Sequence, residues 1–185
     1  MAVHLAKRLL TIEEYHRMSE AGILTEADRV ELLDGEIYQM SPIGSEHGAC
    51  VKRLNQLLNQ LLGEKVIVSV QDPVQIPELS EPEPDIALLA PRSDFYADAH
   101  PLPEEIFLII EVANTSYEKD KLVKLPIYAR AGILEYWIVN LEKGRVEIFQ
   151  KPQKGSYVVE TVAGPGEQLP LRSFGVQIAF EKIMG

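Results

Sequence analysis

The sequence predicts a mixed α/β (α+β) protein in which helices flank a mixed sheet. Amphipathic helical segments alternate with short apolar strands along the chain, and one helical segment, residues 117–131, separates the apolar strands 104–113 and 135–140. A strand, a helix and a second strand in this order predict a crossover between parallel neighbours of one sheet. The 185 residues are 46% hydrophobic and 25% charged, which predicts a single domain over residues 1–185.

Three elements are expected in the first third of the chain. A helix begins at Thr11, whose side chain can cap it in a capping box, and ends near Gly22. Residues 30–40 should form a hairpin whose tip faces water, because Asp-Gly is a two-residue turn signal between strand-forming segments. Residues 49–63 should form a longer helix, because their apolar side chains recur at helical spacing before a glycine.

The rest of the chain is expected to supply most of the sheet. Residues 65–70 read as a short strand, and residues 81–90 read as a second strand that enters the core at Asp85. The unbroken apolar run within residues 104–113 indicates a strand that is buried on both faces. In the helix that follows, Pro126 should cause a kink or a break. Antiparallel strands are expected in the C-terminal part, at residues 145–151, 155–163 and 176–183.

The composition excludes several classes of protein. Cys50 is the only cysteine, which excludes a zinc finger or a disulfide-rich scaffold. The first residues lack the apolar core of a signal peptide, and no apolar run approaches the roughly 20 residues that cross a bilayer. The formal net charge of -10 opposes non-specific coating of DNA but is compatible with a bound divalent cation. We therefore expect a soluble, cytoplasmic protein that does not bind membranes.

Three charged residues lie where apolar elements begin or end. Asp85 follows a proline at the start of one strand, Glu111 ends the apolar run of the next, and Lys124 lies on the following helix. Taken singly, each is more commonly a cap, a strand end or a solvated lysine. Together they form the set that a metal-dependent phosphodiesterase needs, with two carboxylates for a cation and one ammonium for the developing charge.

Five stretches of the chain carry a more specific signal. They are MSPIGSEHG, VQDPVQI, EPEPDIALL, FLIIEVANTS and DKLVKLPIYARAGILEYWIVN, which together span about residues 30–151. The block from residue 111 to residue 140 is the most specific, because it contains a Lys-x-x-x-Tyr and a Glu-Tyr-Trp-Ile-Val element. In these stretches the chain resembles the restriction-endonuclease family known as Uma-two, a branch of the PD-(D/E)XK nuclease superfamily.

The resemblance implies a restriction-endonuclease-like core, here with an extra N-terminal helix and hairpin and with C-terminal antiparallel strands. It implies that Asp85 and Glu111 bind the metal through their carboxylates, with the peptide carbonyl of Val112 as a further ligand. Ala113 stands where the superfamily motif normally has its lysine. Lys124 matches the position on the following helix to which this family has moved that lysine.

An early residue is also expected to complete the site. His47 matches a recurrent histidine of the family, and it can either reach the metal-bound water or a phosphate or make only a local hydrogen bond at the start of its helix. Glu31 is a candidate for the acidic residue that many superfamily members contribute from an early element, and Glu46 is a further candidate. The sequence does not decide which of these three completes the site.

Helical geometry assigns faces to residues 117–131. Asp120 lies four residues before Lys124 and is expected to pair with it or orient it. Lys124 is also expected to share its face with Lys121 and Tyr128. The side chains expected to face the core instead are Leu122, Leu125 and Ala129.

The function that follows is that of a metal-dependent endodeoxyribonuclease. Mg²⁺, with Mn²⁺ as a substitute, would activate a water molecule that hydrolyses phosphodiester bonds of DNA. Because one site cuts one strand, cleavage of both strands would require a homodimer. Two alternatives remain open: a catalytically silent module of the same fold that binds nucleic acid or protein, and a nuclease that acts on RNA or on branched or damaged DNA.

Overall fold

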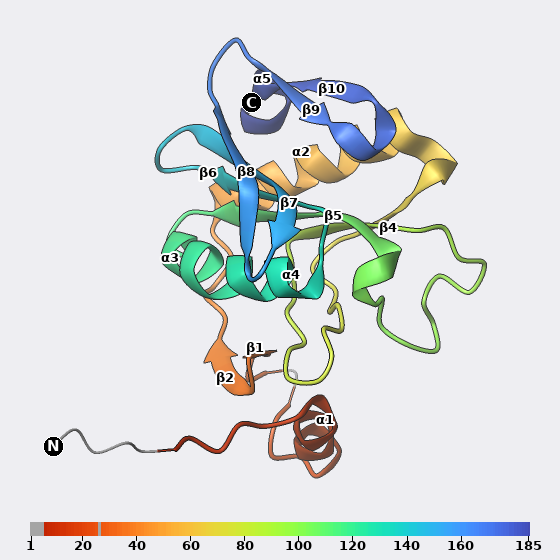
Figure 1. Cartoon of the computed structure of the whole chain (residues 1–185), viewed down its shortest axis with the longest axis vertical. Coiled ribbons are helices and arrows are strands. Elements are labelled where there is room, and N and C mark those ends of the chain that lie inside the picture. Colours follow the sequence, from red (N-terminus) through yellow and green to blue (C-terminus); the bar gives the residue numbers. More distant parts are fainter. Residues whose placement is uncertain (1–5, 26) are drawn as a thin grey trace, which may run out of the picture.

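A six-stranded mixed sheet lies at the centre of the protein. The computed structural model describes residues 6–25 and 27–185, and Figure 1 shows the sheet between two layers of helices. The strand order is β3-β4-β5-β6-β7-β8, and within it only the β5–β6 pair is parallel. This parallel pair confirms the predicted crossover. The strands are β3 (Ile67–Ser69), β4 (Ile86–Leu89), β5 (Ile106–Ala113), β6 (Glu135–Asn140), β7 (Arg145–Gln153) and β8 (Ser156–Ala163).

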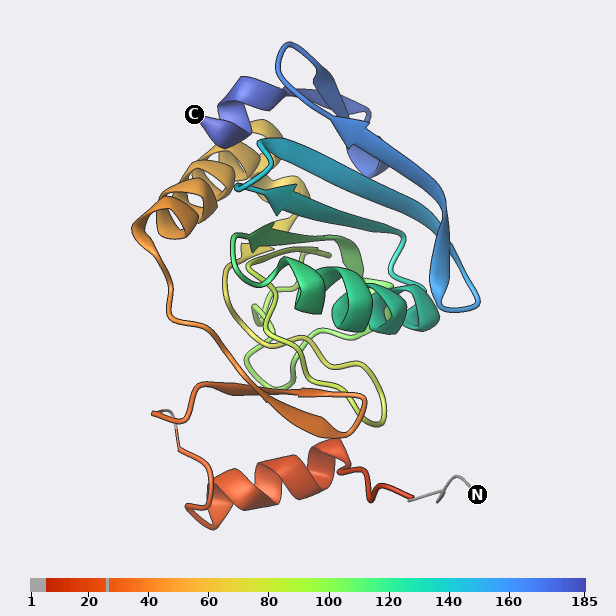
Figure 2. The ribbon, with the colours of Figure 1, turned by 90° about the vertical axis from the view of Figure 1, so that its left-hand side faces the viewer.

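Two separate layers cover the two faces of the sheet. The helix α2 (Ser45–Leu62) packs on one face, together with the hairpin of β9 (Gln168–Leu171) and β10 (Val176–Ala179). The helices α3 (Tyr117–Lys119) and α4 (Leu125–Ala131) lie on the other face. Figures 1 and 2 show these two layers on opposite sides of the sheet. The structure thus confirms the predicted mixed fold with helices on both faces.

Side chains alternate between the two faces along the central strands. On β5, Leu108, Ile110 and Val112 belong to the core beneath α2, whereas Ile109 and Ala113 belong to the core beneath α4. Successive side chains of a strand point to opposite faces. Residue 111 therefore belongs to the face that α3 and α4 cover.

The N-terminal elements form a third part, which Figure 2 shows beyond the α4 side of the sheet. The helix α1 (Ile12–Glu20) begins with the predicted capping box. The predicted hairpin consists of β1 (Val30–Leu33) and β2 (Glu36–Gln39). Its turn residue Asp34 is exposed, but Gly35 is buried, and a Cβ atom there would lie 2.6 Å from Leu9 Cβ. The expectation that the whole tip faces water was wrong, because the segment before α1 crosses it.

The helical segment after β5 differs from the prediction in two ways. A π-helical turn, Asp120–Lys124, joins α3 to α4 without a break, and the Leu125 N–H donates to the Asp120 carbonyl five residues back. Pro126 follows this turn directly, so the residue that lacks an N–H stands where the regular hydrogen-bond pattern of the α-helix is already interrupted. The predicted kink at Pro126 is therefore replaced by a π turn. The turn changes the phase of the helix, so Leu122 is 67% exposed instead of facing the core.

The C-terminal residues correct a further prediction. Residues 176–183 were expected to form one strand, but β10 ends at Ala179 and a short helix, α5 (Phe180–Met184), follows. Phe180 and Ile183 are buried in the core beneath α2, and their spacing of three residues suits a helix. Within residues 6–25 and 27–185, no helix combines the length and the apolarity needed to cross a membrane.

Candidate active site

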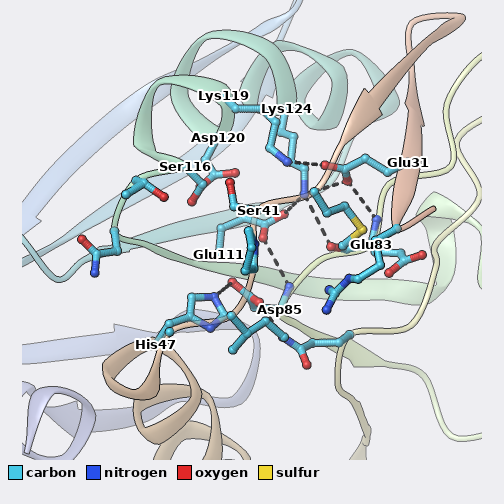
Figure 3. Close-up of a pocket in the computed structure, with 18 residues that line it drawn as sticks. Glu31, Ser41, His47, Glu83, Asp85, Glu111, Ser116, Lys119, Asp120 and Lys124 are labelled. Atoms are coloured by element: carbon cyan, nitrogen blue, oxygen red, sulfur yellow. Dashed lines mark hydrogen bonds and ion pairs between the residues drawn. The ribbon is translucent and has the colours of Figure 1, made fainter. Parts of the chain in front are cut away.

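A cavity of about 200 Å³ lies where the β1–β2 hairpin, the start of α2, the end of β5 and the helical segment after it meet. Figure 3 shows His47 and Asp85 at one end of it, Glu31 and two lysines at the other, and Glu111 between them. The ionisable groups that line it are the acids Glu31, Glu83, Asp85, Glu111 and Asp120, the bases Arg29, Lys119 and Lys124, and His47.

Strand register brings Asp85 and Glu111 together. The antiparallel pairing of β4 with β5 places Ile86 opposite Ile110, so Asp85, just before β4, lies next to Glu111. The Asp85 N–H donates to Glu111 Oε2 at 3.3 Å. Both side chains line the same cavity, so the structure does not place them on opposite faces of the sheet.

Asp85 accepts hydrogen bonds on both of its oxygens. Oδ2 accepts from the Val112 N–H at 2.8 Å and lies 2.9 Å from Nε2 of His47, in the first turn of α2. Oδ1 accepts from Gln71 Nε2 at 3.1 Å. Burial acts to raise the pKa of Asp85, but the hydrogen bond from His47 and its charge outweigh burial and lower that pKa. The same hydrogen bond raises the pKa of His47.

Glu111 has different surroundings. It is buried, and its Oε1 accepts from Lys124 Nζ and from the Tyr128 hydroxyl, each at 3.0 Å. Burial raises the pKa of Glu111 to about 8 although Lys124 acts to lower it, and the negative charges of Asp120 and Asp85 add to the rise. Two neighbouring carboxylates with pKa values shifted in opposite directions are typical of a shared site.

Lys124 is a buried ammonium held between two carboxylates. It is 3% exposed, and its Nζ lies 2.9 Å from Glu31 Oε2 and 3.0 Å from Glu111 Oε1. Burial acts to lower the pKa of Lys124, but these carboxylates outweigh burial and raise it. The alternative of a solvated helix lysine was therefore wrong. Glu31 also accepts from Lys119 Nζ at 2.6 Å and from the Glu83 N–H at 3.2 Å.

Other residues named from the sequence lie in different places. Asp120 lines the cavity but accepts from Ser116 Oγ at 2.7 Å, while the ion pairs of Lys124 go to two glutamates, so the expected pairing of Asp120 with Lys124 was wrong. Lys121 points away from the cavity toward Glu147 and Glu160, because the π turn changes the helix phase. Of the three early candidates, Glu31 and His47 line the cavity, whereas Glu46 is exposed and does not.

The structure explains why a lysine on the helix can replace one on the strand. Ala113 belongs to the same face of β5 as Glu111, but it is fully buried in the core beneath α4. Lys124 reaches Glu111 from that helical layer. The side chain of Val112 faces the opposite core, so only its peptide groups are near the site, and its carbonyl as a metal ligand stays a prediction.

The donor set fits a hard divalent cation. Five acids line the cavity against three bases, so carboxyl groups predominate there, and a divalent cation would offset part of their negative charge. Asp85 Oδ1 and Glu111 Oε2 each accept one hydrogen bond, at 3.1 and 3.3 Å, so each keeps a lone pair. In the part of the chain that the structure describes, no three His, Cys, Asp or Glu side chains form a ready metal-binding group. Mg²⁺ typically takes one or two carboxylates and keeps several waters.

Several residues of the site were not predicted from the sequence. Gln71 and Tyr128 donate to the two central carboxylates, and Arg29 and Glu83 line the cavity. Two of these had a usable signal: Gln71 belongs to the stretch VQDPVQI, and Tyr128 ends the Lys-x-x-x-Tyr element. Glu83 stands two residues before Asp85 in the stretch EPEPDIALL, and this nearness in sequence is the only signal that it belongs to the site.

Comparisons with known proteins agree with this fold. A solved structure covers 95% of this chain and 97% of its own, with a TM-score of 0.76 at 16% identity, and it is described as "a putative nuclease belonging to DUF820" from Anabaena variabilis. No curated protein matches. The model of the Uma2 family, described as "Putative restriction endonuclease", matches residues 12–181. Because this match covers most of the chain, the protein belongs to the Uma2 family, which is the Uma-two family of the sequence resemblance.

Proposed function

We propose that this protein is an endonuclease that hydrolyses phosphodiester bonds of DNA with Mg²⁺, and with Mn²⁺ as a substitute. The family match and the nuclease-like fold support a nuclease. The observation that carries the finer proposal is the convergence of Asp85, Glu111 and the buried ammonium of Lys124 on one cavity. Asp85 and Glu111, with the Val112 carbonyl, would hold the cation.

The residues of this site would have different roles in the reaction. A bound Mg²⁺ would lower the pKa of a water molecule and polarise the phosphate. His47 donates to Asp85 Oδ2 and keeps that carboxylate ionised. Lys124 places a fixed positive charge among buried groups, where electrostatic interactions are stronger than in water, and that charge would stabilise the transition state. Lys119 and Arg29, which also line the cavity, would attract the phosphate backbone of the substrate.

We also propose that the active form is a homodimer, because one site cuts one strand. Among the residues that the structure describes, β8 is an edge strand that pairs on one side only, with β7. Its exposed side chains include Val158 and Val162. Edge strands are usually protected by charge, proline or a covering element, because unpaired strands invite pairing. This edge therefore suits antiparallel pairing with a second copy, which would give a particle of twice 20.7 kDa by light scattering.

A catalytically silent module of the same fold is the second candidate. The formal net charge of -10 opposes the approach of a nucleic acid backbone. In addition, Lys124 is already engaged by Glu31 and Glu111, an arrangement that could serve stability alone. The module would keep these residues without cutting any substrate.

A cleavage assay on several nucleic acids tests the proposal. The protein is incubated with supercoiled plasmid, linear duplex, single-stranded and branched DNA and with RNA, each with Mg²⁺, Mn²⁺ or EDTA. We expect nicking or cutting of DNA with either metal and none with EDTA. Cleavage of RNA alone would show that the substrate is RNA and not DNA. A failure to cut any substrate would favour the silent module.

A further inference from the structure

Tyr128 contacts the same carboxylate oxygen as Lys124. Its hydroxyl donates to Glu111 Oε1 at 3.0 Å, and Lys124 Nζ lies 3.0 Å from that atom. Residues four positions apart lie on one face of a helix, so the Lys-x-x-x-Tyr element aims both donors at Glu111. Tyr128 itself does not line the cavity and is fully buried. It therefore acts on the site through Glu111 rather than on a substrate.

The second oxygen of Glu111 is much less engaged. Oε2 accepts one long hydrogen bond, from the Asp85 N–H at 3.3 Å, and so it faces the side of the site where Asp85 lies. A cation cannot approach the oxygen that already accepts from an ammonium and a hydroxyl without displacing one of them. The two donors on Oε1 thus leave Oε2 as the oxygen available to a ligand.

We infer that Tyr128 is a positioning residue that, with Lys124, holds Glu111 Oε1 and thereby presents Oε2 to a divalent cation beside Asp85. The inference rests on the proposed function, because it assumes that a cation binds there. Lys124 alone holds Glu111 less firmly, since its ammonium is shared with Glu31. The tyrosine ring is fixed by packing against Tyr136, with the ring centroids 5.1 Å apart.

The test compares two variants that each lose one hydrogen-bonded tyrosine hydroxyl. Tyr128→Phe removes the donor to Glu111 and keeps the ring. Tyr157→Phe is the matched control, because Tyr157 packs in the same core and donates at 3.0 Å to the Ile133 carbonyl, away from the cavity. Loss of a residue that orients a metal ligand typically weakens binding 10- to 100-fold. We expect Tyr128→Phe to weaken Mn²⁺ binding, measured by calorimetry, by about 10-fold, and Tyr157→Phe to leave it within about 2-fold.

The outcomes separate this inference from the proposed function. Equal Mn²⁺ affinity in Tyr128→Phe and Tyr157→Phe, with binding intact in the wild type, would overturn the inference and leave the function standing. Absence of Mn²⁺ binding in the wild type would overturn both. Tyr128→Met also lacks the donor and serves as a second variant if Tyr128→Phe does not fold. Wild-type affinity in either folded variant contradicts the positioning role.

Discussion

Replacing Asp85 with asparagine is expected to slow DNA cleavage by at least about 10²-fold, the scale on which one electrostatic group contributes to an active site. The change removes the negative charge that would bind the cation but keeps the volume of the side chain. The new amide oxygen can still accept from the Val112 N–H and from His47. The fold should therefore persist, and plasmid cleavage together with the thermal midpoint would show both effects.

Asp72→Asn provides the control for this substitution. Asp72 lies in the same connection between β3 and β4, accepts from Ser69 Oγ at 2.8 Å and does not line the cavity. The Asp72→Asn variant should therefore cleave DNA at the wild-type rate. Equal activity of Asp85→Asn and Asp72→Asn would remove Asp85 from the active site.

Removing Lys124 is expected to have the largest effect on stability. Lys124→Ala leaves the buried carboxylates of Glu31 and Glu111 without their shared ammonium. Breaking a buried ion pair in this way costs about 3–5 kcal/mol of unfolding free energy. Lys124 lowers the pKa of both carboxyl groups, so without it each pKa is higher in the folded variant than in the folded wild type, and the folded variant binds more protons. Its stability relative to the wild type therefore falls as pH rises, and urea denaturation should show a larger deficit at pH 8 than at pH 5.

Lys121→Ala is the matched control for the lysine. Lys121 also contacts a buried glutamate, Glu147, but that carboxylate keeps Arg145 as a partner. Lys121→Ala should lose clearly less stability than Lys124→Ala. Equal stability of the two variants would contradict the role of Lys124 as the shared ion-pair partner of Glu31 and Glu111.

Where Lys124→Ala is still folded, it should cleave DNA at least about 10²-fold more slowly than the wild type. If Lys124→Ala cleaves DNA as fast as the wild type, another lysine has the catalytic role, and Lys119 is the other lysine that lines the cavity.

Local sequence signals predicted much of the fold. The capping box at Thr11, the turn at Asp34 and the helix end at Gly63 each depend on a few neighbouring residues, and the structure confirms all three. The parallel β5–β6 pair followed from the order of strand, helix and strand. The convergence of Asp85 and Glu111 could be expected as well, because it depends on which ends of neighbouring strands meet.

Features that depend on tertiary contacts could not be read from the sequence. Nothing local marks the π turn, and it decides that Leu122 is exposed and that Lys121 leaves the cavity. Glu31 is held in the site by ion pairs with lysines about 90 residues further along the chain, so no local sequence pattern indicates that its carboxylate is buried there. The short helix α5 escaped notice because a run of few apolar residues suits a strand or a helix equally well.

Calorimetric titration with Mg²⁺ tests directly whether Asp85 and Glu111 form a cation site. The variants are Glu111→Gln and, as a control, Glu135→Gln, because Glu135 is also a buried strand glutamate whose pKa is raised by burial, but it lies outside the cavity. We expect one Mg²⁺ to bind per chain in the wild type and in Glu135→Gln, and no Mg²⁺ to bind in Glu111→Gln. Absence of binding to the wild type at millimolar Mg²⁺, or unchanged binding to Glu111→Gln, would contradict this expectation.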